Sequence, residues 1–252
     1  MCELFGFTSV VPMDIHSSLK IFFSHSLTNP DGFGLKVFGD KGFEMREPVR
    51  AVDSKKLMKR IDNKVVAETA IAHIRFATHG KNKKDNCHPF SLKDSTGRQW
   101  TLAHNGYIEN NQFMDSIELI QKGETDSERI LYYIVSYVDM MMSIAKRTKI
   151  KNLEMTERDR IAIVDAALEE VSKLGKVNLL IYDGELLYVY SNAYGTLNYL
   201  KDEKYVLEEQ PGMMDWSIDK KREVALDLVD SKYISYLALE EGKIIGFMSL
   251  VN

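Results

Sequence analysis

Cysteine is scarce in this sequence, and no long apolar run is present. The 252 residues include only Cys2 and Cys87, too few for the disulfide framework of a small secreted domain. No apolar stretch reaches the roughly 20 residues that a membrane-spanning helix needs. The start of the chain has no basic leader, and Glu3 interrupts its apolar residues, so we expect no secretion signal. These absences predict a cytoplasmic protein with reduced thiols and no membrane partner.

An excess of basic residues is also absent. The formal net charge is −4, which argues against a nucleic-acid partner held by phosphate contacts. The local basic run of Lys81, Lys83 and Lys84 is typical of a solvated loop. Hydrophobic residues make up 44% of the chain and charged residues 28%, a balance typical of a globular protein with a sizeable core. The length suits one large domain or two small ones, and since no obvious linker is present, a single domain spanning 1–252 is favoured.

Apolar periodicity and turn signals predict strands, then helices, then strands, which favours helix layers packed on antiparallel sheets. Ser54 and Thr125 are expected helix caps, the latter in a capping box with Glu128. Asp183-Gly184 is typical of a hairpin turn, and so is Asn105-Gly106, which would break its strand. Strands are expected at 4–11, 33–38, 42–49, 65–78, 99–108, 177–182, 185–190, 204–207, 233–239 and 243–250, and helices at 13–27, 54–61, 111–121, 125–146 and 157–174.

The second residue offers a possible nucleophile. Removal of Met1 would leave Cys2 with a thiol and a free α-amine, whose pKa values in model peptides are about 8.5 and 7.7–8.0. A nucleophile and a base on one residue are the requirement of an N-terminal nucleophile. A cysteine at this position is more often a small buried residue at the start of a strand. The position alone therefore leaves both interpretations open.

Five short stretches, in this order and spacing, resemble the class II glutamine amidotransferases, which are N-terminal nucleophile hydrolases and include the glutaminase domain of glucosamine-phosphate synthase. The segment 177–184 also looks like the small stand-alone members of the group. The resemblance implies an α+β fold, a four-layer αββα sandwich, formed by 1–252 as one domain. The stretches are MCELFG at 1–6, AHIRFATHG at 72–80, NCHPF at 86–90, AHNGYI at 103–108 and GETDSE at 123–128.

The resemblance implies a catalytic role for three residues. Cys2 would attack the side-chain amide of glutamine and form a γ-glutamyl thioester, with its own α-amine carrying the proton. The side-chain amide of Asn105 and the backbone N–H of Gly106 would form the oxyanion hole, where one donor typically contributes roughly 2.7–4 kcal/mol. A tight turn remains the alternative for Asn105-Gly106.

The resemblance also implies substrate-binding residues. Arg75 would grip the substrate α-carboxylate, supported by Thr78, and Asp126 would pair with the α-ammonium group. A solvated strand arginine and a carboxylate at a helix N-terminus are the structural alternatives. Gly34 and His88 are possible supporting residues, the glycine equally explained by a turn and the histidine by packing or loop hydrogen bonds.

No metal and no cofactor are expected. Four histidines lie in the motifs, but their spacings do not suggest zinc. A phosphate-cradling glycine loop and a dinucleotide fingerprint are both missing. The chain has no room for an ammonia-consuming synthase domain, so the expected partners are glutamine or another γ-glutamyl amide, and possibly a separate ammonia-accepting protein.

Three functions stay open from the sequence. The first is a glutamine amidotransferase or glutaminase, and the second is a γ-glutamyl amide hydrolase for a larger γ-glutamyl metabolite. The third is a catalytically silent regulatory scaffold, against which the retained motif residues argue. Cys87 stands where many relatives would carry threonine, and it is either a small buried filler or an oxidisable thiol near the site.

Overall fold

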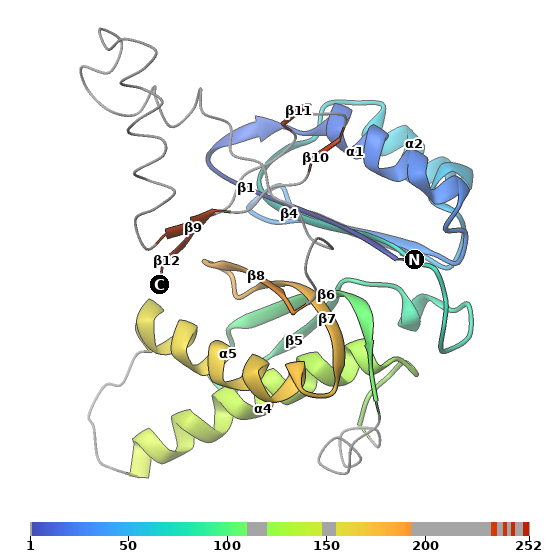
Figure 1. Cartoon of the computed structure of the whole chain (residues 1–252). Coiled ribbons are helices and arrows are strands. Elements are labelled where there is room, and N and C mark those ends of the chain that lie inside the picture. Colours follow the sequence, from blue (N-terminus) through green and yellow to red (C-terminus); the bar gives the residue numbers. More distant parts are fainter. Residues whose placement is uncertain are drawn as a thin grey trace, which may run out of the picture.

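The computed structural model describes residues 2–109, 120–147 and 155–192, together with four short strands between 233 and 251. Its elements form four layers: helices, sheet, sheet, helices (Figure 1). The helices are α1 His16–Ser24, α2 Lys55–Ile61, α4 Asp126–Arg147 and α5 Glu157–Ser172, and the strands are β1 Glu3–Asp14, β2 Phe33–Val37, β3 Phe43–Glu47, β4 Val66–Ile74, β5 Phe90–Lys93, β6 Gln99–Ile108, β7 Gly175–Tyr182, β8 Leu187–Ser191, β9 Tyr233–Ser235, β10 Leu239–Glu240, β11 Lys243–Ile244 and β12 Ser249–Val251.

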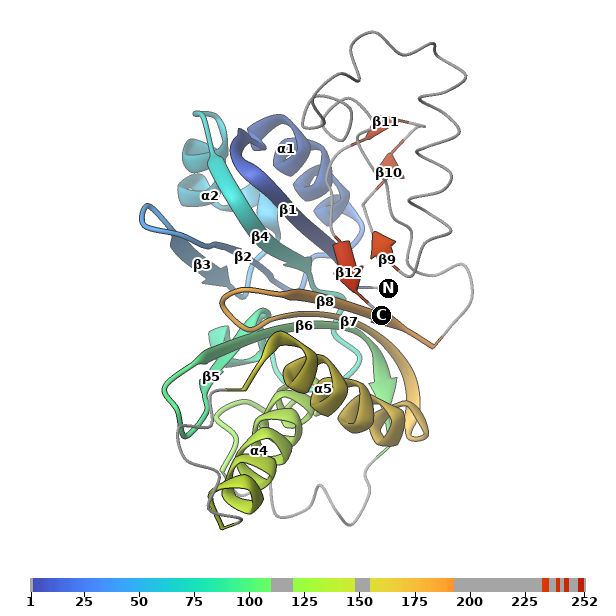
Figure 2. The same cartoon turned by 90° about the vertical axis from the view of Figure 1, so that its left-hand side faces the viewer.

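Two antiparallel four-stranded sheets lie face to face, in the strand orders β1-β4-β2-β3 and β5-β6-β7-β8. Helices α1 and α2 cover the outer face of the first sheet, and α4 and α5 cover the outer face of the second (Figure 2). This arrangement confirms the predicted αββα architecture. The inclusion of residues 193–252 in the same domain stays a prediction. No helix in the described part of the chain is long and apolar enough to cross a membrane.

Side-chain alternation builds the layers. Odd-numbered residues of β1, such as Phe5 and Phe7, are buried against α1. Even-numbered residues face the other sheet, where Gly6 lies against Leu180: a β-carbon at Gly6 would come within 3.1 Å of that leucine. The layer between the sheets is thin and made of small and branched residues, namely Ile71, Ala103, Leu180, Leu187 and Val189.

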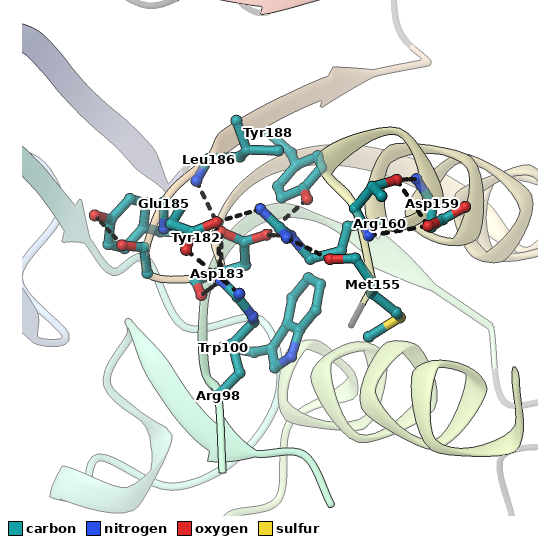
Figure 3. A network of polar contacts seen from close by, with 12 residues as sticks. Arg98, Trp100, Met155, Asp159, Arg160, Tyr182, Asp183, Glu185, Leu186 and Tyr188 are labelled. Atoms are coloured by element: carbon teal, nitrogen blue, oxygen red, sulfur yellow. Dashed lines mark hydrogen bonds and ion pairs between the residues drawn. The ribbon is translucent and has the colours of Figure 1, made fainter. Parts of the chain in front are cut away.

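A buried ion pair fastens α5 to the β7–β8 hairpin (Figure 3). Asp183 is fully buried, and its carboxylate accepts hydrogen bonds from Arg160 Nε at 2.7 Å and Tyr188 Oη at 2.8 Å. It also accepts from the backbone N–H groups of Glu185 and Leu186, which shape the turn. The predicted hairpin at Asp183-Gly184 is confirmed, and Gly184 has a positive φ of 97° there.

The local sequence signals correctly predicted the N-cap of α2, but they failed to predict that two segments would be extended in strands. Ser54 caps α2 by accepting from the Leu57 N–H, as predicted. Residues 13 and 14 do not begin α1, because they pair with β4 and extend β1. Asn105-Gly106 is not a turn, because β6 continues through it and pairs with β7 as far as Ile108. The predicted helix at 111–121 and strand at 204–207 lie outside the described residues, apart from 120 and 121.

The capping box predicted at Thr125 forms in part. Thr125 Oγ1 accepts from the Glu128 N–H at 3.3 Å and so caps α4. The Glu128 carboxylate does not return to the cap residue. It accepts instead from the N–H groups of Lys122, at 3.1 Å, and Gly123, at 2.6 Å. The turn before α4 is therefore held by the first turn of its own helix.

Candidate functional site

Cys2 lies at the start of β1, where the chain enters the first sheet. Its thiol contacts the backbone of Phe76 twice: Sγ donates to the Phe76 carbonyl at 3.3 Å and accepts from the Phe76 N–H at 3.2 Å. Phe76 follows β4, the strand that pairs with β1. The β1–β4 ladder thus carries the thiol to the end of the sheet beside the loop at 76–88.

Burial governs the protonation of this thiol. Partial removal from water raises the pKa of Cys2 above its ordinary value, because a partly buried thiolate loses solvation. The hydrogen bond from Phe76, the positive charge of the chain's N-terminus and the charge of Arg75 act in the opposite direction, and Asp126 adds to the rise. The thiol is therefore protonated at neutral pH and needs a base to become a nucleophile.

Cross-sheet contacts fix which parts of the two sheets face each other. Ile71 of β4 packs with Ala103 of β6 in the layer between the sheets. One step further along β4, the ring of His73 stacks on His88 with centroids 4.0 Å apart. His88 Nδ1 in turn accepts from the backbone N–H of His104, the residue that follows Ala103 on β6. The two strands therefore advance in the same direction across the interface.

The same progression brings the predicted catalytic residues together. Arg75 follows His73 on β4 by two residues, and Cys2 lies opposite Arg75 by the β1–β4 register. Asn105 follows Ala103 on the face of β6 that points toward the first sheet. Cys2, Arg75 and Asn105 therefore share one end of the layer between the sheets, with Gly106 beside them.

The backbone N–H of Gly106 points out of the edge of its sheet. Alternate residues of a strand direct their N–H groups to the same side. His104 and Ile108 direct theirs away from β7, to His88 Nδ1 at 3.2 Å and to Asp126 Oδ2 at 2.9 Å. Gly106 lies between them with the same parity. The N–H of Gly106 thus points away from β7, at the part of β6 that extends past the end of β5, between the contacts to His88 and to Asp126.

Close packing requires glycine at position 106. A β-carbon there would lie 1.9 Å from the Lys176 carbonyl oxygen and 2.6 Å from His104 Nε2. Gly34 is similarly constrained, since its β-carbon would lie 1.7 Å from the His88 carbonyl oxygen. Gly34 therefore lets the 86–89 segment cross β2 at van der Waals distance, and it touches the site through His88.

Arg75 is buried, and its guanidinium group holds the loop that follows it. Five oxygen atoms accept from its two terminal nitrogens at 2.7 to 3.4 Å, four of them backbone carbonyls. Arg75 thus acts as the internal support of the loop at 79–82. The acceptors are the carbonyls of Asp31, His79, Gly80 and Lys81 and the side-chain oxygen of Asn82.

The Asp31 carboxylate holds the loop from its other side. It accepts from the Ala77 N–H at 2.8 Å and from Asn82 Nδ2 at 3.2 Å. Asp31 was not among the site residues predicted from the sequence. Thr78 lies in the same loop and is exposed.

Asp126 begins α4 and faces the end of β6. Its Oδ2 accepts from the Ile108 N–H, and its Oδ1 lies 3.4 Å from the hydroxyl of Ser127. Ser127 also contacts His104 Nδ1 at 2.9 Å, and His104 Nε2 lies 3.3 Å from the Lys176 carbonyl. Because a carbonyl only accepts, Nε2 carries the proton of a neutral His104. The unprotonated Nδ1 then accepts the single proton of the Ser127 hydroxyl, so His104 links β7 to the first turn of α4.

Three histidines are buried behind the site. Burial lowers the pKa of His73 to about 3 and lowers those of His88 and His104, the last opposed by the charge of Asp126. All three are therefore neutral near pH 7 and pack behind the site, where His88 and His104 also make hydrogen bonds. No cluster of metal-ligating side chains occurs among the described residues.

Cys87 is fully buried next to Gly32, with its sulfur 3.4 Å from the Glu47 carbonyl and 3.6 Å from that of Lys83. Burial raises its pKa to about 11. Of the two interpretations of this thiol, the structure favours the buried filler.

Comparisons with known proteins identify the family. The family model for class II glutamine amidotransferases matches residues 1–223. The chain is 26% identical to a putative glutamine amidotransferase of Haemophilus influenzae, over 98% of this chain and 84% of that protein. It is also 26% identical to an uncharacterized protein of Methanocaldococcus jannaschii, over all of this chain but only 65% of the length of that relative.

The fold agrees with these sequence matches. The crystal structure of a predicted glutamine amidotransferase from Pseudomonas aeruginosa superposes with a TM-score of 0.51 at 24% identity, covering 80% of each chain. That likeness concerns the fold, and the family model concerns the sequence. Together they show that this chain belongs to the class II glutamine amidotransferases.

Proposed function

We propose that this protein hydrolyses the side-chain amide of glutamine to glutamate and ammonia, with Cys2 as an N-terminal nucleophile. The observation that supports this most is the convergence at one end of the sandwich. The Cys2 thiol lies just before β1, and Asn105 and Gly106 belong to β6, which contacts β1 and β4 across the two sheets. A nucleophile beside two potential oxyanion donors is what attack on an amide carbonyl requires.

The proposed reaction begins with the removal of Met1. The freed α-amine of Cys2 takes the thiol proton as sulfur attacks the amide carbon. Asn105 and Gly106 donate to the oxyanion of the tetrahedral intermediate. The intermediate collapses to a γ-glutamyl thioester, and the amine returns the proton to the leaving ammonia. Water then cleaves the thioester, releasing glutamate and regenerating the thiol.

The two charged groups would select a free amino acid. Asp126 would pair with the substrate α-ammonium group and Arg75 with the α-carboxylate. The Arg75 terminal nitrogens already donate to loop oxygens, so a bound carboxylate must exchange with some of them. We therefore expect the loop at 79–82 to shift when substrate binds, with Thr78 as a possible additional contact.

Ammonia would pass to a separate acceptor protein or to solvent, in the reducing cytoplasm where the thiol persists. The whole chain, 1–252, would act as one domain, without a metal or cofactor. Gly34 and His88 would support the site from behind.

Glutamate release from glutamine by the processed protein tests the proposal. Substitution Cys2→Ala should lower the rate by more than about a thousandfold, as removal of a nucleophile does in other hydrolases. Cys87→Ala is the matched control and should keep the activity, because that thiol is fully buried against the carbonyls of Glu47 and Lys83. A strong preference for larger γ-glutamyl amides would favour a γ-glutamyl amide hydrolase. Absence of turnover on every γ-glutamyl compound would favour a silent scaffold.

A further inference from the structure

The loop that Arg75 supports is fastened to the turn before α4 by two side chains, Asn86 and Glu124. Glu124 Oε2 accepts from the Lys81 N–H at 2.9 Å and from Asn86 Nδ2 at 3.1 Å. Asn86 Oδ1 accepts from the Glu124 N–H at 2.8 Å, and its Nδ2 also donates to the Lys81 carbonyl at 2.8 Å. Lys83 Nζ adds an ion pair with Glu124 Oε1 at 3.1 Å.

This clasp, defined as Asn86 with Glu124, is tightly packed around two glycines. Asn86 is fully buried. A β-carbon at Gly80 would lie 2.8 Å from Asn86 Nδ2, and one at Gly123 would lie 2.6 Å from Asn86 Oδ1. Glycine at both positions therefore lets the loop and the turn approach closely enough for the clasp to close.

The clasp joins the two ends of the proposed substrate site. Lys81, held by Glu124, gives its carbonyl to both Asn86 Nδ2 and Arg75 Nη1. Glu124 precedes Asp126 by two residues, across the cap of α4. Hydrogen bonds from Arg75 to Glu124, followed by two residues of backbone, thus connect the guanidinium group proposed to bind the α-carboxylate with the carboxylate proposed to bind the α-ammonium group.

The charge of Glu124 persists over the pH range in which an enzyme would work. Hydrogen bonds from the Lys81 N–H, Asn86 and Lys83 lower the pKa of Glu124 to about 2. The carboxylate is therefore ionised and accepts hydrogen bonds throughout neutral and mildly acidic conditions.

We infer that Glu124 is a positioning residue that sets the spacing between Arg75 and Asp126 and so determines selectivity for a free amino-acid end. This inference rests on the proposed function and extends it to a residue that does not touch the reacting atoms. Glu124 would take no part in the bond-making steps and would only hold Arg75 and Asp126 at their separation. A displacement of about 1 Å in such a frame is enough to weaken substrate recognition by roughly tenfold to a hundredfold.

The first test compares kinetics of Glu124→Ala and Glu124→Gln in the processed, full-length protein. The alanine variant should raise KM for glutamine by about tenfold or more while kcat changes little. The glutamine variant keeps one acceptor for the Lys81 N–H and should recover part of the loss. The increase should be smaller for 4-carbamoylbutanoate, which lacks the α-ammonium group. Glu170→Gln is the control, because it also removes an exposed glutamate paired with a lysine, at 2.6 Å.

The second test does not depend on activity. Hydrogen–deuterium exchange should accelerate in peptides covering 77–88 and 120–126 of Glu124→Ala, and not in Glu170→Gln. Unchanged exchange, or a fall in kcat with unchanged KM, would overturn the inference. A wild-type protein without any turnover would refute the proposed function, yet faster exchange in Glu124→Ala would still establish the clasp.

Discussion

At the scale of single residues, the central feature is a thiol whose environment favours its protonated form. Burial raises the pKa of Cys2, while the Phe76 N–H and Arg75 only partly offset this. Cysteine hydrolases that rely on an imidazolium partner show the opposite shift. Here the buried histidines are neutral, and none is hydrogen bonded to Cys2 among the described contacts. A neighbouring α-amine is the proposed base that this environment requires.

Alkylation measures this shift directly. In protein that retains Met1, we expect the rate of Cys2 carboxamidomethylation by iodoacetamide to rise with pH through a pKa above that of a free cysteine, because the thiolate fraction stays small at neutral pH. Mass mapping separates Cys2 from Cys87, whose fully buried thiol should react more slowly. A Cys2 reaction pKa well below 8 would contradict the account of the site.

At the scale of elements, pairing between strands distant in sequence determined the structure wherever it competed with a local turn signal. Ser54 and Asp183-Gly184 act within a few residues, and the sequence predicted both features correctly. Asn105-Gly106 carries an equally strong turn signal, but cross-strand pairing with β7 keeps it extended. The Asn86–Glu124 clasp was not predicted, because it joins two irregular segments whose proximity no periodicity encodes. Membership of both residues in the quoted motifs was its only signal.

The ion pair at the start of α5 gives a stability prediction. Asp183→Asn removes the buried carboxylate that accepts from Arg160 Nε, and it leaves the half-exposed Glu185 as the other carboxylate paired with this nearly fully buried guanidinium group. We expect the free energy of unfolding to fall by about 3–5 kcal/mol, the usual cost of breaking a buried pair. Chemical denaturation followed by circular dichroism measures it.

Asp159→Asn is the control for that experiment, because Asp159 is an exposed acid in the capping box of the same helix. Its loss should cost about 1 kcal/mol. Equal effects of the two substitutions would show that the buried pair has no special weight in holding α5 to the hairpin.

At the scale of the whole molecule, the sheets are joined by a thin apolar layer at one end and by the histidine stack at the other. The stack of His73 and His88, linked to His104, replaces apolar packing near the site. The sequence predicted the sandwich through its resemblance to a family and left packing or loop hydrogen bonding open for these histidines. Their mutual contact depends on the alignment of two sheets, which no local pattern specifies.

The stack makes stability depend on pH. The folded protein keeps these histidines neutral, whereas the unfolded chain protonates them below a pKa of about 6.5. The unfolded state therefore binds more protons as the pH falls from about 6.5, and the free energy of unfolding decreases. Each histidine contributes up to about 1.4 kcal/mol per pH unit. Above that pH the contribution is constant.

Denaturant titrations between about pH 5 and 7 measure this slope. His88→Asn keeps an acceptor for the His104 N–H and should reduce the slope by about one proton. An unaltered slope in His88→Asn would mean that this histidine takes up its proton equally in both states.

The proposed chemistry depends most directly on the N-terminus that the protein presents. Glutamate release should therefore be measured on two samples whose intact masses establish that one begins at Cys2 and the other retains Met1. The account predicts turnover by the sample beginning at Cys2 and none by the sample retaining Met1, because only a free α-amine can carry the thiol proton. Equal turnover by both samples would contradict it.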